Sequence, residues 1–243
     1  IGSCIVNILL IVGLSAITRP IKVKERTIKK ELPLLVIITT AFFILVTDSL
    51  FKKSAVNSLS RADAIMLLIW FILFMFYIIG IVRKNKNNEY DIPEYSIVKS
   101  IILIILSLLA ITLSSNIVVD NAVLLASQIG ISQKIISMTV IVIGTSLPEL
   151  TMTINAARKD EFDMAVGNII GTNIFNICIV LGLPIAIYGG VSSSSFSVVD
   201  TSVVLISALM FYIFGRSNKE LSRREGILMV LVFILYYIYI FII

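Results

Sequence analysis

The stretch Val140-Ile141-Val142-Ile143-Gly144-Thr145-Ser146-Leu147-Pro148-Glu149-Leu150 places an ionisable side chain inside an apolar run. It belongs to residues 134–155, a segment long enough to cross a membrane as a helix. Pro148 has no backbone N–H and clashes with the preceding turn, so we expect the helix to bend or break around residues 144–148. A break frees backbone carbonyls, chiefly that of Val142, and a membrane tolerates free carbonyls only where they face a cavity or an ion.

Glu149 has two hydroxyl-bearing neighbours upstream. Thr145 and Ser146 lie four and three residues before it, so we expect both hydroxyls to share a helix face with its carboxylate. A carboxylate, two hydroxyls and loose carbonyls form an all-oxygen set, which suits hard cations such as Na⁺ and Ca²⁺. The alternative is that Glu149 reaches the membrane surface or pairs with a lysine, but no basic residue lies within a turn of it. Since an acidic residue inside a membrane segment is by default a functional-site hypothesis, we predict a cation site here.

The composition indicates a membrane protein. Of the 243 residues 58% are hydrophobic and 14% are charged, and the mean hydropathy is +1.04. A soluble domain of this length cannot bury so much apolar surface, whereas a lipid-facing protein has no such limit. The net charge of +5 sits in short loops between apolar runs, which argues against a nucleic-acid partner.

Several classes of chemistry are excluded by the residue types. The chain has no histidine, so histidine catalysis and His-ligated zinc are ruled out. Its two cysteines, Cys4 and Cys178, lack metal-site spacing and are expected to pack as small apolar residues. With no nucleophile–base set visible, we predict that the chain is not an enzyme and uses no cofactor.

Apolar segments of spanning length recur along the chain, and residues 1–18 form a shorter one. The spans are 34–51, 63–82, 98–118, 134–155, 163–188, 198–215 and 225–243. Residues 98–129 read as one long or broken helix, since polar residues interrupt the apolar run. The expected fold is therefore an all-α polytopic membrane protein with about eight segments, located in the cell membrane.

The loops between these segments predict the orientation. Numbered in chain order, the first, third, fifth and seventh loops hold fifteen of the 20 lysines and arginines. These loops are 19–33, 83–97, 156–162 and 216–224. The positive-inside rule places these loops in the cytoplasm and the C-terminus outside.

The sequence also repeats itself. A shift of 169 residues aligns residues 2–8 with 171–177, Gly13-Leu14 with Gly182-Leu183 and Glu31 with Asp200. A shift of 162 then aligns Arg61 with Arg223 and Asp63 with Glu225. The order of glycine, asparagine and charged positions favours a duplication over the chance similarity of apolar helices.

The repeat predicts the domain organisation. We expect residues 1–83 to be the remainder of a first repeat whose N-terminal helices are missing, 84–97 a cytoplasmic linker, and 98–243 a second repeat of five helices. Because five is odd, the second repeat enters the membrane from the opposite side, which is the inverted-repeat plan of many secondary transporters.

A second polar constellation follows in residues 167–176. Asn168, Thr172 and Asn176 recur every four residues and form a polar stripe on an otherwise apolar helix. Hydrogen bonding between helices is the alternative to ion binding, and we favour it for Asn168 near the helix start. For Thr172 and Asn176, and for their repeat partners Ser3 and Asn7, we favour a ligand role.

Residues 144–150 and 167–177 together closely resemble the second signature repeat of the calcium/cation antiporter superfamily, and the nearest group is the prokaryotic sodium/calcium exchangers. Residues 2–14 resemble the end of the first signature repeat, and 98–129 resembles the family's long sliding helix. The resemblance implies a ten-helix inverted-repeat exchanger with cation sites at mid-membrane and a first-repeat glutamate upstream of Ile1.

The resemblance also implies roles for individual residues. Glu149 would bind both Ca²⁺ and Na⁺, and the remaining ligands would be Thr145, Ser146, Thr172, Ser3, Asn7, Asn176 and the Val142 carbonyl. This sequence departs from the family at Asn176, where some members have aspartate, and at Cys4, where asparagine is usual.

Three functions follow for testing. The first is exchange of Ca²⁺ for Na⁺ by alternating access, performed by a monomer in the lipid bilayer. The second is Ca²⁺/H⁺ exchange, with Glu149 protonated in place of sodium binding. The third, from another class, is a channel-like or structural membrane subunit.

Overall fold

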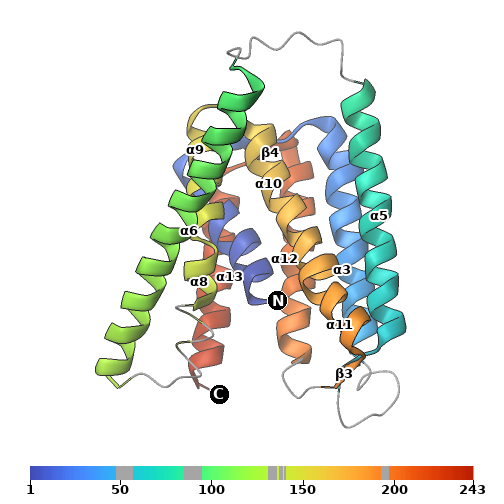
Figure 1. Cartoon of the computed structure of the whole chain (residues 1–243), viewed down its shortest axis with the longest axis vertical. Coiled ribbons are helices and arrows are strands. Elements are labelled where there is room, and N and C mark those ends of the chain that lie inside the picture. The colour runs from blue at the N-terminus through green and yellow to red at the C-terminus, as the bar shows by residue number, and fades with distance from the viewer. Residues whose placement is uncertain are drawn as a thin grey trace. The chain divides into compact units, whose positions relative to one another are not determined.

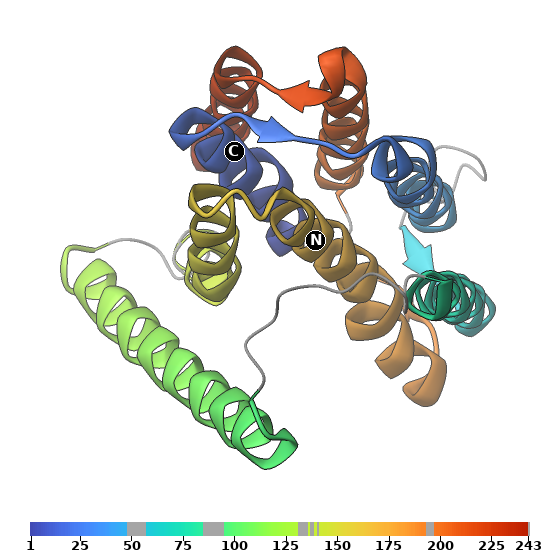
Figure 2. The ribbon, with the colours of Figure 1, turned by 90° about the horizontal axis from the view of Figure 1, so that it is seen from above.

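The computed structural model describes residues 1–47, 57–84, 95–130, 136, 139, 141–192 and 197–242 (Figures 1 and 2). They form two compact units, a larger one of residues 1–71 and 149–243 and a smaller one of residues 72–148. Among the described residues, five helices are long and apolar enough to cross a membrane. The helical segment Gly2–Thr18 is also apolar but shorter than these five. The five are Arg61–Ile81, Ile97–Gln128, Phe162–Tyr188, Val198–Lys219 and Arg223–Ile242.

The elements of the larger unit fall into two series. The first is α1 Gly2–Ile5, the π-helical segment η1 Val6–Val12, α2 Gly13–Thr18, β1 Ile21–Lys22, the π-helical segment η2 Thr27–Glu31, α3 Leu32–Val46, β2 Ser58–Leu59 and the start of α5 Arg61–Lys84. The second is α9 Leu147–Arg158 from Glu149 on, α10 Phe162–Phe175, the π-helical segment η4 Asn176–Leu181, α11 Gly182–Tyr188, β3 Val191–Ser192, α12 Val198–Arg216, the 3₁₀ turn η5 Ser217–Lys219, β4 Glu220–Leu221 and α13 Arg223–Ile242.

The smaller unit contains the rest of α5, the long helix α6 Ile97–Gln128 and the short helix α8 Val142–Thr145. The sequence left open whether residues 98–129 form one helix or a broken one, and the structure has a single unbroken helix. Ser114 and Asn121 do not interrupt it because their side chains donate hydrogen bonds to the carbonyls of Ala110 and Ile117, four residues upstream.

Two short antiparallel ladders join the two series, and their registers repeat each other. In the first ladder β1 pairs with β4, with Ile21 opposite Leu221 (Figure 2). The shift of 162 aligns Leu59 with Leu221, and Ile21 aligns with Val191 at one residue more than the shift of 169. Leu59 and Val191 are opposite each other in the β2–β3 ladder. Each ladder thus takes one strand from each series, as a two-fold relation between the series requires.

The helices after β2 and β4 begin with matching caps. The side-chain oxygen of Asp63 accepts hydrogen bonds from the N–H and the hydroxyl of Ser60 at 2.9 and 2.6 Å. Glu225 does the same for Ser222, at 2.7 Å for both bonds. These are capping boxes, and they explain why the sequence aligns Asp63 with Glu225 at a shift of 162.

Close helix crossings are also duplicated. A Cβ on Gly13 would lie 3.0 Å from the Gly226 carbonyl oxygen and 3.4 Å from the Cβ of Met229. The repeat partner of Gly13, Gly182, faces the carbonyl of Ala64 and the Cβ of Leu67 in the same way. The small residues let each pair of backbones approach, so the crossing of α2 with α13 corresponds to that of α11 with α5.

Helices α3 and α12 of the larger unit pack against each other, and they are repeat partners. Phe42 of α3 and Phe211 of α12 are equivalent at a shift of 169, and both are fully buried. The ladder of β1 and β4 joins the start of α3 to the end of α12, so the two helices run antiparallel. Figure 1 shows β3 beside α11, at the end of the molecule away from β4.

The prediction of a loop over residues 19–33 is wrong for its second part, which is helical. Residues 27–31 form η2, and α3 follows directly with Pro33 in its first turn, where the missing N–H of proline leaves no bond unmade. Residues 48–51 of the span 34–51, residues 85–94 of the linker 84–97 and most of residues 131–140 lie outside the described residues.

Candidate cation-binding site

The break predicted around Pro148 is present. Helix α8 ends at Thr145, Ser146 has φ −95° and ψ 4°, and α9 begins at Leu147. Pro148 cannot donate to the carbonyl four residues upstream, so the helical hydrogen-bond ladder is interrupted there. Thr145 and Glu149 therefore belong to different helices, with Ser146 between them. The expectation that one helix face carries the two hydroxyls and the carboxylate is wrong, because it assumed regular helical spacing across Ser146.

The end of α8 satisfies part of its own backbone. The Thr145 hydroxyl donates to the Val142 carbonyl at 3.1 Å, and the Ser146 N–H donates to the Ile143 carbonyl at 3.1 Å. The Val142 carbonyl, expected to be free, therefore accepts a side-chain hydrogen bond and keeps one lone pair for another partner. The Ser146 residue is buried, whereas Thr145 is exposed.

Glu149 stands in the first turn of α9, where the positive end of the helix dipole favours a negative charge. Its Oε2 atom is buried and has no hydrogen-bond partner among the described residues. No basic side chain of the described part pairs with it, so the lysine-pairing alternative finds no partner. A buried carboxylate oxygen without a partner is unfavourable unless it takes up a proton or a cation.

Two asparagines of α10, Asn168 and Asn173, lie in different surroundings. The amide of Asn168 donates to the Thr153 hydroxyl at 3.3 Å and so links α10 to α9, which confirms its predicted role between helices. Asn173 is buried, its amide donates to the Ile169 carbonyl at 2.7 Å, and its Oδ1 atom has no partner in the described part of the chain. Neither Thr153 nor Asn173 was predicted from the sequence. Asn173 could have been found from its spacing of three residues from Asn176, which is close to one helical turn.

Asn7 is the most isolated polar side chain of the first series. It is 1% exposed, and neither its Oδ1 nor its Nδ2 has a partner among the described residues. Ser3 lies one turn earlier in α1 and is half-buried. Burying both ends of an amide without hydrogen bonds is costly, and each such group in a folded protein calls for an explanation such as an ion.

Both asparagines predicted as ligands lie in π-helical segments. Asn7 is the second residue of η1, and its repeat partner Asn176 is the first residue of η4. Single π-helical turns inside α-helices occur frequently at functional sites, since the wider turn disturbs the regular carbonyl ladder. The helix that leads into η4 lies beside η1, since α1 and η1 both pack against α10.

The donors gathered in the larger unit are thus amides, hydroxyls and one carboxylate. No group of three or more acidic or cysteine side chains that could hold a metal occurs in the described ranges. A site built mainly of neutral oxygens around one fixed charge suits a cation that enters and leaves, rather than a permanently bound metal.

Two helical series in inverted orientation, each with a π-helical segment that carries an asparagine, fit the inverted-repeat plan of secondary transporters. The chain belongs to the sodium/calcium exchanger protein family, whose model matches residues 1–80 and 99–242.

Curated relatives agree with this family. The chain is 35% identical to the inner membrane protein YrbG of Escherichia coli K12, over 94% of this chain and 71% of that protein. It is 34% identical to the putative antiporter CaxA of Alkalimonas amylolytica, with coverage of 97% and 75%. It is 27% identical to the sodium/calcium exchanger MaX1 of Methanosarcina acetivorans, with coverage of 99% and 78%.

Solved structures give the same result for the fold. The chain superimposes on the sodium-calcium exchanger NCX_Mj with a TM-score of 0.76 and 31% sequence identity, covering 96% of this chain and 72% of that one. The chain is therefore a multi-pass membrane protein with the fold of an exchanger, as the residues 144–150 and 167–177 indicated.

Proposed function

We propose that the chain exchanges Ca²⁺ for Na⁺ across the membrane by alternating access. The observation that carries the proposal is a set of buried side-chain oxygens that have no partner among the described residues, those of Asn7, Asn173 and Glu149, in a chain of the exchanger family. A buried oxygen without a partner is unfavourable, and a cation bound to it would offset that cost.

The ligands proposed for the two ions overlap. Glu149 supplies the fixed negative charge, and the neutral oxygens come from a larger set: Thr145, Ser146, Thr172, Asn176, Ser3, Asn7 and the Val142 carbonyl. Since both ions need Glu149, occupancy by one excludes the other, and this competition couples their movements. Ca²⁺ takes six to eight oxygen ligands, so its binding weakens when Na⁺ occupies some of the shared oxygens, and Ca²⁺ is released.

The repeat organisation belongs to the same proposal. We infer repeats at residues 1–83 and 98–243 joined by a linker at 84–97, and the swapped ladders and duplicated capping boxes support this division. Two structurally equivalent halves in opposite orientation can exchange conformations, which converts an outward-open site into an inward-open one. We also propose that the chain acts as a monomer without enzymatic activity, and a mass measurement in detergent tests the former.

The test is calcium uptake into vesicles loaded with Na⁺, with the pH clamped equal on both sides. We expect labelled Ca²⁺ to enter when the Na⁺ gradient points outward and to stop entering when K⁺ replaces the internal Na⁺. Uptake that ignores sodium but follows an imposed pH gradient would establish Ca²⁺/H⁺ exchange instead. Uptake that needs no counter-ion would establish a channel.

A further inference from the structure

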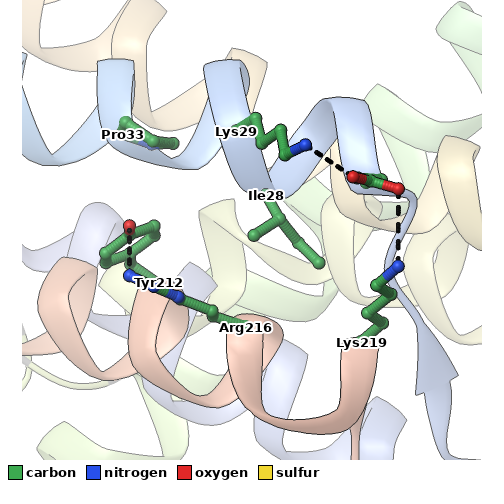
Figure 3. A pocket seen from close by; sticks show the side chains of 7 residues that line it. Ile28, Lys29, Pro33, Tyr212, Arg216 and Lys219 are labelled. Atoms are coloured by element: carbon green, nitrogen blue, oxygen red, sulfur yellow. Dashed lines mark hydrogen bonds and ion pairs between the residues drawn. The ribbon is translucent and has the colours of Figure 1, made fainter.

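A cavity of about 450 Å³ lies between the η2–α3 segment and the end of α12 (Figure 3). Its wall contains two apolar residues, Ile28 and Pro33, and five polar or charged ones: Glu25, Lys29, Tyr212, Arg216 and Lys219. None of these residues belongs to the candidate cation site. The cavity adjoins the β1–β4 ladder, on the side that the loop charges place in the cytoplasm.

The cavity has an excess of positive charge. Three cationic side chains face one carboxylate, that of Glu25, which pairs with Lys29 at 2.6 Å and with Lys219 at 3.4 Å. Arg216 donates to the Tyr212 hydroxyl at 3.3 Å and is paired with no carboxylate in the described part of the chain. Figure 3 shows Lys29 on one wall, and Tyr212, Arg216 and Lys219 on the opposite wall at the end of α12 and in η5. A guanidinium, two ammonium groups and a hydroxyl are the donors that bind a phosphate group.

The fold itself does not need these charges. The positions equivalent to this cavity in the other repeat lie at the opposite ends of α3 and α12. There Val198 is equivalent to Lys29, and the equivalents of Arg216 and Lys219 are Thr47 and Asn57. The equivalents of Pro33 and Tyr212 are Ser202 and Phe43. The same helix pair is therefore built at its other end without a cationic side chain at these positions, so the charges serve something specific to the cytoplasmic end.

We propose that this cavity binds the phosphate headgroup of an anionic lipid from the cytoplasmic leaflet. A basic pocket between membrane helices on this side of the membrane is suited to an anionic headgroup. Apolar side chains continue along both walls into the membrane: Ile37 lies one turn beyond Pro33 on α3, Leu209 lies one turn before Tyr212 on α12, and both are exposed. They offer an acyl chain a surface that a free phosphate ion does not use.

Glu25 occupies the place of the headgroup when the cavity is empty. Its hydrogen bonds to Lys29 and then to Lys219 hold its pKa below the ordinary value for a glutamate, so it is ionised at neutral pH. An incoming phosphate competes with Glu25 for the two lysines. Removing the carboxylate should therefore strengthen lipid binding, and removing the cations should weaken it.

The experiment measures phosphatidylglycerol retained by the purified full chain, using native mass spectrometry during a lipid titration in neutral detergent. Three variants are compared with the unchanged protein. Arg216→Gln with Lys219→Gln removes two cavity charges, and Glu25→Gln removes the competing carboxylate. Arg223→Gln with Arg224→Gln removes two exposed charges from the same cytoplasmic end but outside the cavity, which makes it the matched control. Phosphatidylcholine and inorganic phosphate are added in separate arms.

We expect the cavity double variant to bind phosphatidylglycerol roughly tenfold more weakly than the control double variant, and Glu25→Gln to bind it more tightly than the unchanged protein. Equal losses in the two double variants would overturn the proposal, since they would show attraction to surface charge in general. It would also be overturned if Glu25→Gln weakened binding, if phosphatidylcholine bound equally well, or if inorganic phosphate displaced the lipid at equal concentration.

Discussion

Asn7 shows at the scale of one residue what a transport site requires. Its amide is buried and neither polar atom has a partner among the residues that the structure describes, and a buried polar group without a partner costs about 1–3 kcal/mol. The sequence predicted Asn7 as a ligand through its repeat partner Asn176, but it could not show that the amide is unpaired. That property depends on which helices surround the side chain, and no local pattern encodes it.

Glu149→Gln is the sharpest test at this scale. Glutamine keeps the size of the side chain and one oxygen but removes the only carboxylate proposed for the site, so sodium-driven calcium uptake should fall by at least about tenfold. Glu161→Gln is the control, because Glu161 is exposed at the start of α10 and makes no side-chain cap. A channel would instead keep its flux in Glu149→Gln and change only its selectivity.

Asn7→Leu should separate function from stability. Leucine fills nearly the same volume without a polar group, so the midpoint of thermal unfolding in detergent should stay unchanged or rise while calcium uptake falls. Thr153→Val is the comparison: it removes the partner of Asn168 and should lower stability by about 1 kcal/mol. If Asn7→Leu destabilises the chain as Thr153→Val does, Asn7 has a structural partner and is not a ligand.

Glu25 gives a prediction about acidity. Because its pKa is lowered in the folded chain by Lys29 and Lys219, its ion pairs stabilise the fold above the ordinary pKa of glutamate, and this contribution disappears as the pH falls through the lowered pKa. In lipid-free detergent, Glu25→Gln should therefore unfold slightly earlier than the unchanged protein at neutral pH. The two melting curves should coincide in strong acid, and a difference that grows on acidification would contradict this assignment.

Elements were predictable from the sequence where a long apolar run or a proline determines them. Residues 98–129 form the long helix α6, and the break at Pro148 is present as expected. The strands were not predictable, because two-residue ladders are too short to show alternation. The π-helical segments η1 and η4 have the composition of ordinary helices, and tertiary packing rather than propensity produces them.

Gly226→Ala tests the crossing of α2 and α13. The new Cβ would lie 2.7 Å from the Gly13 carbonyl oxygen and 3.0 Å from the Cβ of Ala16, so the helices must move apart, at about 1–3 kcal/mol. Gly80→Ala is the control, since a Cβ there meets nothing within 4 Å and alanine favours the helix by up to about 1 kcal/mol. Thermal unfolding in detergent should show opposite shifts; equal shifts would mean that the crossing is not close.

At the scale of the molecule, the inverted repeat predicts which ends of the helices face which side of the membrane. Cys4 and Cys178 are buried, so single exposed cysteines can be added without removing them. Ser217→Cys, beside the β1–β4 ladder, should react with a membrane-impermeant maleimide only from the cytoplasmic side. Tyr188→Cys, at the end of α11, should react only from outside, and labelling of both from one side would refute the topology.

The swapped ladders have a consequence for how the chain is made. Strand β1 leaves the ribosome long before its partner β4, and β2 long before β3, so neither ladder can close while the first half alone is in the membrane. Such distant pairing delays folding until late in synthesis. The early helices must therefore remain in the bilayer as separately inserted helices with their apolar surfaces in contact with lipid. The final structure forms only after α12 and α13 have been inserted. Interrupted synthesis would leave a membrane-inserted remnant with open strand edges, which is the kind of species that quality-control proteases remove.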